Sequence, residues 1–159
     1  EKGVVSELYI HPENAEAYQP AVDAIMNADL IILGPGSLYT SILPNLMVPG
    51  IQKAILKAIG KKIYVCNVAT EIGETQGFDV SDHVEVLQSH TNEKILDCVI
   101  ANNNITETGD QFAGEAVYIN NSTIKNIAVI YDDLIDSDHA VRHDSDKLAN
   151  SLLKIINQS

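Results

Sequence analysis

Short runs of branched apolar residues alternate with segments of helical periodicity along this chain. Residues 29–33 end in four consecutive apolar side chains, which is typical of a strand buried on both faces in a parallel sheet. Further strands are predicted at residues 3–10, 62–66, 95–101, 116–119 and 125–130. Apolar side chains at helical spacing predict helices at residues 15–27, 42–47, 51–59, 79–90 and 145–156. The alternation predicts an α/β fold with a mainly parallel sheet and helices on both sides.

Prolines and capping residues refine the predicted helices. Pro20 lies inside the first of them and favours a kink or two short turns. Pro49 and Gly50 separate the helices at 42–47 and 51–59, and Pro49 suits a first helical position. Asp79 or Ser81 suits the N-cap of the helix that ends near residue 90.

A glycine turn joins the first apolar run to a helix. Gly34, Pro35 and Gly36 follow the predicted strand, and a hydroxyl-rich stretch leads into the helix. Unpaired N–H groups and the dipole at a helix N-terminus attract anions, so we expect a phosphate-bearing ligand here. The stretch is neither a Walker A loop nor G-x-G-x-x-G, and the alternative is a simple change of chain direction. The candidate ligand-binding residues are Gly34, Gly36, Ser37, Leu38, Tyr39, Thr40 and Ser41.

Polar residues also follow the next two predicted strands. Ligands of parallel α/β sheets bind beyond the carboxyl ends of the strands, so Gly34, Asn67 and Asn102 should share one site. In the long loop after residue 66, Asn67, Thr70, Glu74 and Thr75 are candidates to hydrogen-bond a sugar or base. Glu71, Glu74, Asp79 and Asp82 are candidates to hold a divalent ion that bridges phosphates. Asp79 and Asp82 more often cap a helix, and a lone His83 is more often a packing residue.

Arg142 is the single arginine of the chain and lies among six aspartates. One interpretation is an ion pair that relieves acidic repulsion, with Asp144 or Ser145 capping the last helix. The other is a bidentate contact with a ligand phosphate, for which a guanidinium is well suited.

Composition narrows the classes of function. The chain has 159 residues, 45% of them hydrophobic, which fits one α/β domain over residues 1–159. A net charge of −12 argues against nucleic acids and anionic membranes as partners. Cys66 and Cys98 lie in apolar runs and are expected to be reduced packing residues in a cytoplasmic protein. No membrane span or signal peptide is expected, and the absence of an initiator Met suggests a piece of a longer chain.

Three segments resemble one family closely. ADLIILGPGSLYTSILPNLMVPGI, KIYVCNVATEIGETQGFDVSDHV and VRHDSDKLA, together spanning much of residues 24–152, are similar to the CofD-like family. The loop that begins at Gly34 has the form of the gluconeogenesis-factor branch (YvcK-type proteins), whereas the phospholactate transferases carry G-P-S-N-P-x-T-S-I. The family's G-G-G-T-G and Asp-Asp-Gly-Gly elements do not occur, so the chain resembles the carboxyl-terminal half of a member. Residues 105–114 are shorter than usual, with Phe112 where a tyrosine is expected.

The resemblance implies a Rossmann-like three-layer fold and a nucleotide diphosphate ligand. For this branch it implies a UDP-sugar of the UDP-N-acetylglucosamine class and control of cell shape and cell-wall synthesis on gluconeogenic carbon. By similarity, the ligand would contact Gly36, Ser37, Thr40, Ser41, Asn67, Thr70 and Arg142. Ser145 lies where some relatives carry a phosphorylatable threonine.

Three hypotheses for function remain at this point. The first is a non-catalytic, nucleotide-sugar-binding regulator, because no catalytic triad or paired catalytic carboxylates can be identified. The second is a 2-phospho-L-lactate transferase-like enzyme that uses Mg²⁺. The third is a structural half that binds nothing alone. The base of the ligand and the oligomeric state, a homodimer included, are left open.

Overall fold

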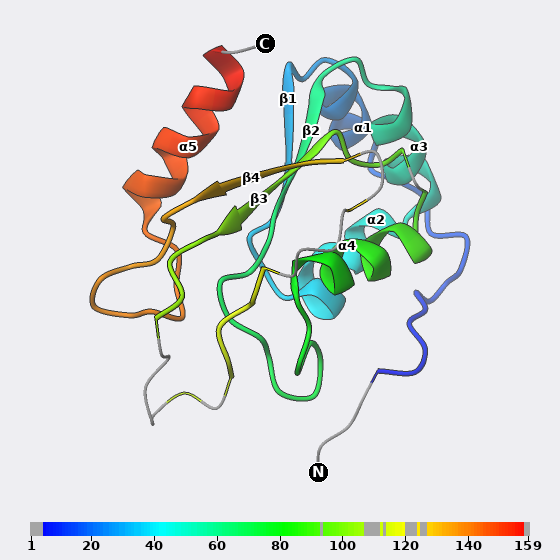
Figure 1. The fold of residues 1–159 in the computed structure, drawn as a ribbon. Helices are drawn as coiled ribbons and strands as arrows, with labels where there is room; N and C mark the ends of the chain where they lie inside the picture. The colour runs from blue at the N-terminus through cyan, green and yellow to red at the C-terminus, as the bar shows by residue number, and fades with distance from the viewer. Residues whose placement is uncertain are drawn as a thin grey trace.

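The fold is a parallel α/β sheet with helices on both faces. The structure is a computed structural model, described here for residues 5–92, 94–106, 112, 114–119, 124 and 127–157. Its four parallel strands lie in the order β1-β2-β3-β4 (Figure 1). They are β1 (Leu30–Leu33), β2 (Lys61–Val65), β3 (Cys98–Asn102) and β4 (Ala128–Asp132). The predicted α/β class and parallel sheet are confirmed.

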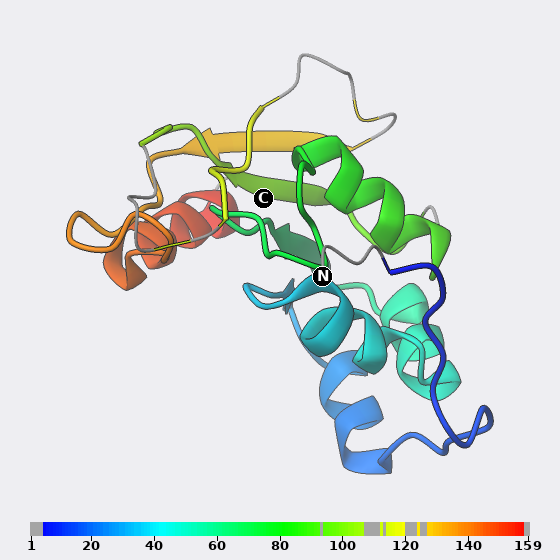
Figure 2. The ribbon, with the colours of Figure 1, turned by 90° about the horizontal axis from the view of Figure 1, so that it is seen from below.

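Helices form the outer layers. They are α1 (Gln19–Met26), the π-helix η1 (Leu38–Ile42), α2 (Leu43–Leu46), α3 (Pro49–Lys57), α4 (Val80–Ser89) and α5 (Ser145–Asn157). The segments α2, α3 and α4 lie on one side of the sheet and α5 lies on the other (Figure 2). Pro49 begins α3, as the sequence predicts.

Strand residues alternate between two cores because successive side chains point to opposite faces. Tyr64 and Val99 pack toward α3 and α4, whereas Ile63 and Ile100 pack toward α5. All five residues of β3 are buried. The central strands therefore read as continuous apolar runs in the sequence.

The expectation that the first apolar run is buried on both faces is wrong. β1 is an edge strand, and Ile32 on its α5-facing side is 43% exposed. Branched apolar residues indicate a strand, but they do not reveal whether a neighbour covers it.

Three other predicted elements differ from the structure. Residues 5–10 form no strand; Val5 and Leu8 instead rest against the core on the α3–α4 side. In the predicted strand at 116–119, Ala116 makes only an isolated bridge with Ala69. The first helix begins at Gln19, because Pro20 occupies its first turn and no kink is needed. Residues 3, 4, 125 and 126 of the predicted strands lie outside the described residues.

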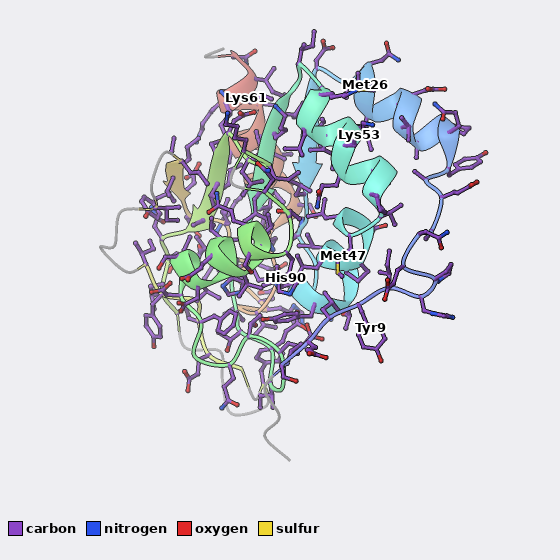
Figure 3. The ribbon with its side chains drawn as sticks, turned by 90° about the vertical axis from the view of Figure 1, so that its right-hand side faces the viewer. Tyr9, Met26, Met47, Lys53, Lys61 and His90 are labelled. Carbon is purple, nitrogen blue, oxygen red and sulfur yellow. The ribbon has the colours of Figure 1, made fainter. Side chains whose placement is uncertain are left out.

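The N-terminal segment and α1 border the side of the molecule away from α5. Tyr9 extends outward and is 76% exposed, while Met26 of α1 lies near Lys53 of α3 (Figure 3). A Cβ on Gly50 would come within 2.5 Å of the Ala17 Cβ, so glycine permits the close approach of this segment to α3.

Candidate functional site

A cleft of about 820 Å³ lies at the carboxyl edge of the sheet, within the range of small-molecule sites. The loops after β1 and β2 form one wall, and the turn into α5 forms the other. Parallel pairing places the carboxyl ends of β1, β2 and β3 at one edge of the sheet, as the sequence predicts, and the end of β4 lies beside them (Figure 1). Five predicted site residues line the cleft: Gly36, Ser37, Asn67, Arg142 and Ser145.

The turn after β1 is fixed by a glycine. Gly34 has φ +92°, and a Cβ there would lie 2.9 Å from the Val65 carbonyl oxygen. Only glycine meets both the left-handed backbone and the close approach to β2 without strain. The turn thus delivers Gly36 and Ser37 to the cleft beside the end of β2.

The residues that follow turn away from the cleft. Leu38 and Tyr39 are buried in the core, because they continue the apolar side of η1 and α2. Thr40 is not part of the cleft lining. Gly34 and Ser41 instead line an adjacent hollow of about 330 Å³ beside β1. The cleft therefore does not support a ligand role for five of the predicted residues, which stays a prediction: Gly34, Leu38, Tyr39, Thr40 and Ser41.

A carboxylate contacts the turn at which the sequence predicts a phosphate. The Ser37 hydroxyl donates a 2.5 Å hydrogen bond to Glu71 Oε2, and Asn67 Nδ2 donates to Glu71 Oε1 at 3.3 Å. The Glu71 backbone N–H donates to Thr75 Oγ1 at 2.9 Å. Two predicted ligand-binding residues are therefore already hydrogen-bonded to an acidic side chain.

A second glutamate holds the start of η1. The Tyr39 backbone and the Thr40 side chain hydrogen-bond to Glu74. Burial, with a smaller contribution from the charge of Glu71, raises the pKa of Glu74. Glu74 therefore stabilises the helix start and leaves Glu71 as the acidic group that faces the cleft.

Two other polar candidates have structural partners. Thr70 is buried, and its Oγ1 accepts a 3.0 Å hydrogen bond from the Glu115 backbone. Asn102 lies at the predicted sheet edge, but its side chain accepts from the Leu134 N–H at 3.1 Å and donates to the Asn104 carbonyl at 2.7 Å. These contacts join loops, and neither residue lines the cleft.

Arg142 lines the cleft from the turn before α5. Within the described ranges its guanidinium has no ion pair or hydrogen bond, whereas nearby acidic residues are paired with lysines: Asp133 with Lys147 at 2.8 Å and Asp132 with Lys154 at 2.9 Å. The expected ion-pair role is thus filled by lysines. The Arg142 backbone is held by bonds to His139 at 2.8 Å and Asp136 at 2.9 Å, which leave the side chain available.

The N-terminus of α5 is capped by the protein itself. Asp144 Oδ1 accepts from the N–H groups of Asp146 and Lys147, both at 2.9 Å. This confirms Asp144, one of the two predicted caps. The two backbone N–H groups that Asp144 binds are therefore not available to an anion. Ser145, the first residue of α5, lines the cleft close in sequence to Arg142.

His143 ties the two walls together and was not identified from the sequence. Its Nε2 donates to the Cys66 carbonyl at 3.2 Å, since a carbonyl oxygen can only accept. Burial lowers the pKa of the ring, and the bond to Cys66 opposes this only partly. The ring is therefore neutral at pH 7. Only its adjacency to Arg142 could have indicated it.

The other acidic and histidine candidates between β2 and the first turns of α4 have structural roles. Asp79 and Asp82 form a capping box at α4 with two 2.9 Å bonds, as the capping interpretation predicts. His83 is buried against Phe78, with ring centroids 5.5 Å apart, which fits a packing residue.

The part of the chain that the structure describes holds no group of three or more His, Cys, Asp or Glu side chains suited to a metal. Mg²⁺ nevertheless needs only one or two carboxylates when ligand phosphates supply other oxygens, and Glu71 could be one of them.

Cys66 and Cys98 are buried free thiols, as expected, and burial raises the pKa of Cys66 to about 12.

Comparison with known proteins assigns the chain to a family. The family model described as 2-phospho-L-lactate transferase CofD matches residues 1–159. This chain belongs to the CofD family. The CofD-family chain is 34% identical to the gluconeogenesis factor of Listeria innocua over 96% of its own length and 49% of that protein. It is 35% identical to the gluconeogenesis factor of Bacillus subtilis, covering 97% of this chain and 51% of that protein.

A solved structure shows the same fold. A UPF0052 family member from Bacillus halodurans superposes with a TM-score of 0.88 at 32% identity, covering 94% of this chain and 50% of that one. The CofD-family chain spans about half the length of the relatives it matches, which confirms the expectation that it corresponds to half of a member. Within the described residues, no helix has the length and apolar character needed to cross a membrane.

Proposed function

We propose that the whole protein binds a nucleotide sugar of the UDP-N-acetylglucosamine class and acts as a non-catalytic regulator of cell shape and cell-wall synthesis on gluconeogenic carbon. Its named relatives are gluconeogenesis factors, and the proposal rests on that membership. The observation that carries ligand binding is the guanidinium of Arg142, which faces the cleft without a protein partner among the described residues.

The charges of the cleft support a ligand that is anionic at one end. An unpaired arginine offers two parallel N–H groups to a phosphate, with geometry that lysine cannot match. Among described lining residues, Arg142 is the sole cation and Glu71 the sole carboxylate. A diphosphate with neutral groups attached fits this arrangement better than a uniformly anionic ligand.

The groups at the cleft favour binding over catalysis. His143 already donates its Nε2 hydrogen to the Cys66 carbonyl, and the Ser37 hydroxyl donates its hydrogen to Glu71. No described lining serine is hydrogen-bonded to a histidine, the pairing that activates a nucleophile.

The alternative is a 2-phospho-L-lactate transferase-like enzyme. The name of the matching family model favours it, and Glu71 could hold Mg²⁺ against ligand phosphates. The bound ion would neutralise phosphate charge, while Arg142 and Asn67 would orient the ligand.

Titration calorimetry of the whole protein with UDP-N-acetylglucosamine tests the proposal, and saturable binding is expected. A parallel assay with a phospholactyl donor, an acceptor and Mg²⁺ should show no turnover. Turnover would establish the transferase alternative, and an absence of binding would refute the nucleotide-sugar proposal. The same titration on the 159-residue chain shows whether this half binds alone.

A further inference from the structure

The cleft is lined by one cationic and one acidic side chain, here called its cationic end and its acidic end, and the two come from different parts of the chain. Arg142 lies in the turn before α5, whereas Glu71 lies in the loop after β2. A ligand that contacts both side chains therefore meets opposite electrostatic preferences at the two contacts.

The acidic end is organised for hydrogen bonding. Glu71 accepts from the Ser37 hydroxyl on one carboxylate oxygen and from the Asn67 amide on the other. Its backbone N–H donates to the hydroxyl of Thr75, a residue that is 1% exposed. A carboxylate has about four lone-pair positions, so both oxygens can accept further hydrogen bonds.

A phosphate is a poor occupant of this end. Its charge would face the charge of Glu71, and its oxygens can only accept, as can those of the carboxylate. A hydroxyl-bearing group has the opposite character, because it donates to a carboxylate and accepts from the Asn67 amide or the Ser37 hydroxyl. Acidic side chains bind ribose hydroxyls in dinucleotide sites for the same reason.

We infer that Ser37, Asn67 and Glu71 form a hydroxyl-recognising subsite for a sugar ring of the ligand, with Glu71 as its specificity-determining residue, and that the phosphates lie toward Arg142. This rests on the proposed nucleotide-sugar function and orients that ligand in the cleft. A ligand hydroxyl donates to Glu71 in place of the Ser37 hydroxyl, which then becomes free to bond the sugar. When the ligand hydroxyl replaces the Ser37 hydroxyl at Glu71, the Ser37 hydroxyl, the Glu71 carboxylate and the ligand hydroxyl all keep a hydrogen-bond partner.

The test uses Glu71→Gln in the whole protein, with Glu74→Gln as the matched control on the same loop. Glutamine keeps one acceptor oxygen for Ser37 and removes the charge, and thermal unfolding verifies that the variants fold. UDP-N-acetylglucosamine and inorganic pyrophosphate are the probes for calorimetry, each measured with Mg²⁺ and with a chelator.

We expect Glu71→Gln to weaken UDP-N-acetylglucosamine binding about tenfold or more, since a bond to a charged acceptor is lost. Pyrophosphate binding should be unchanged or tighter, and Glu74→Gln should have little effect on either probe. Equal or tighter binding of the sugar nucleotide by Glu71→Gln would overturn the inference. So would a loss seen only with Mg²⁺, which would make Glu71 a metal ligand.

Failure of the proposed function gives a different pattern. If the unmodified protein binds pyrophosphate but no UDP-sugar, the nucleotide-sugar proposal fails and the subsite fails with it. If it binds UDP-N-acetylglucosamine and Glu71→Gln binds equally well, only the subsite fails.

Discussion

Ser37 Oγ lies 2.5 Å from Glu71 Oε2, so the hydroxyl after the glycine turn faces a carboxylate. This contact places the acidic end of the cleft beside the β1 turn, whereas the cationic end is Arg142, in the turn before α5. A phosphate-binding turn of the expected kind would instead present unpaired donors.

Ser37→Asp should weaken binding of UDP-N-acetylglucosamine at least about tenfold, because a second carboxylate would stand beside Glu71 and exclude the ligand. Ser37→Ala, which removes the hydroxyl without adding charge, should bind within a few-fold of the unmodified protein. Calorimetry on both variants makes the comparison. Undiminished affinity in Ser37→Asp would show that the β1 turn does not contact the ligand.

Ser145→Asp should weaken the same ligand several-fold. The new charge lies on the cleft wall three residues from Arg142 and competes with the phosphates for the guanidinium. Ser145→Ala keeps the wall neutral and should bind normally. Phosphorylation of Ser145 is expected to act in the direction of the aspartate. Equal affinities of the two variants would remove the case for Ser145 as a regulatory site.

Gly34→Ala should lower the free energy of unfolding by about 1–3 kcal/mol, because the left-handed backbone is strained for alanine. The added Cβ would also press on the Val65 carbonyl. Gly73 is a matched control, with φ +83° and no atom within 4 Å of an added Cβ. Urea unfolding of Gly34→Ala and Gly73→Ala separates strain from contact, and Gly34→Ala should be the less stable.

Folding stability should fall as the pH drops from about 7.5 to 5. Burial lowers the pKa values of His83 and His143 below the ordinary value of 6.5. The unfolded chain therefore binds protons that the folded chain resists, so the stabilisation present above pH 6.5 is lost below it. His143→Asn and His83→Asn should each make the dependence shallower. Urea midpoints at the two pH values provide the measurement, and an unchanged slope in both variants would contradict it.

The sheet could be predicted because its physical signals are local. Apolar runs marked β1, β2 and β3, and the parallel topology that follows from the α/β alternation brought Asn67 to the same edge as Gly36. Asp79 and Pro49 marked helix starts for reasons of hydrogen bonding and backbone geometry.

Which side chains line the cleft could be predicted less well from the sequence. The placement of Glu71 depends on how a long loop folds back onto the β1 turn, a contact between residues 34 positions apart. The sequence allows Leu38 and Tyr39 to be either ligand contacts or core residues, and the structure shows that both are buried in the core. The exposure of Ile32 depends on which strand order the chain adopts.

The most direct test of the central claim is calorimetric titration of UDP-N-acetylglucosamine into the whole protein and into Arg142→Gln. Loss of the bidentate contact should weaken binding about 10- to 100-fold. The free energy of unfolding should change by less than about 0.5 kcal/mol, since the described guanidinium has no partner to lose. Lys154→Gln, which removes a cation outside the cleft, should bind normally. Equal affinity of Arg142→Gln and the unmodified protein would contradict the assignment of this cleft as the nucleotide-sugar site.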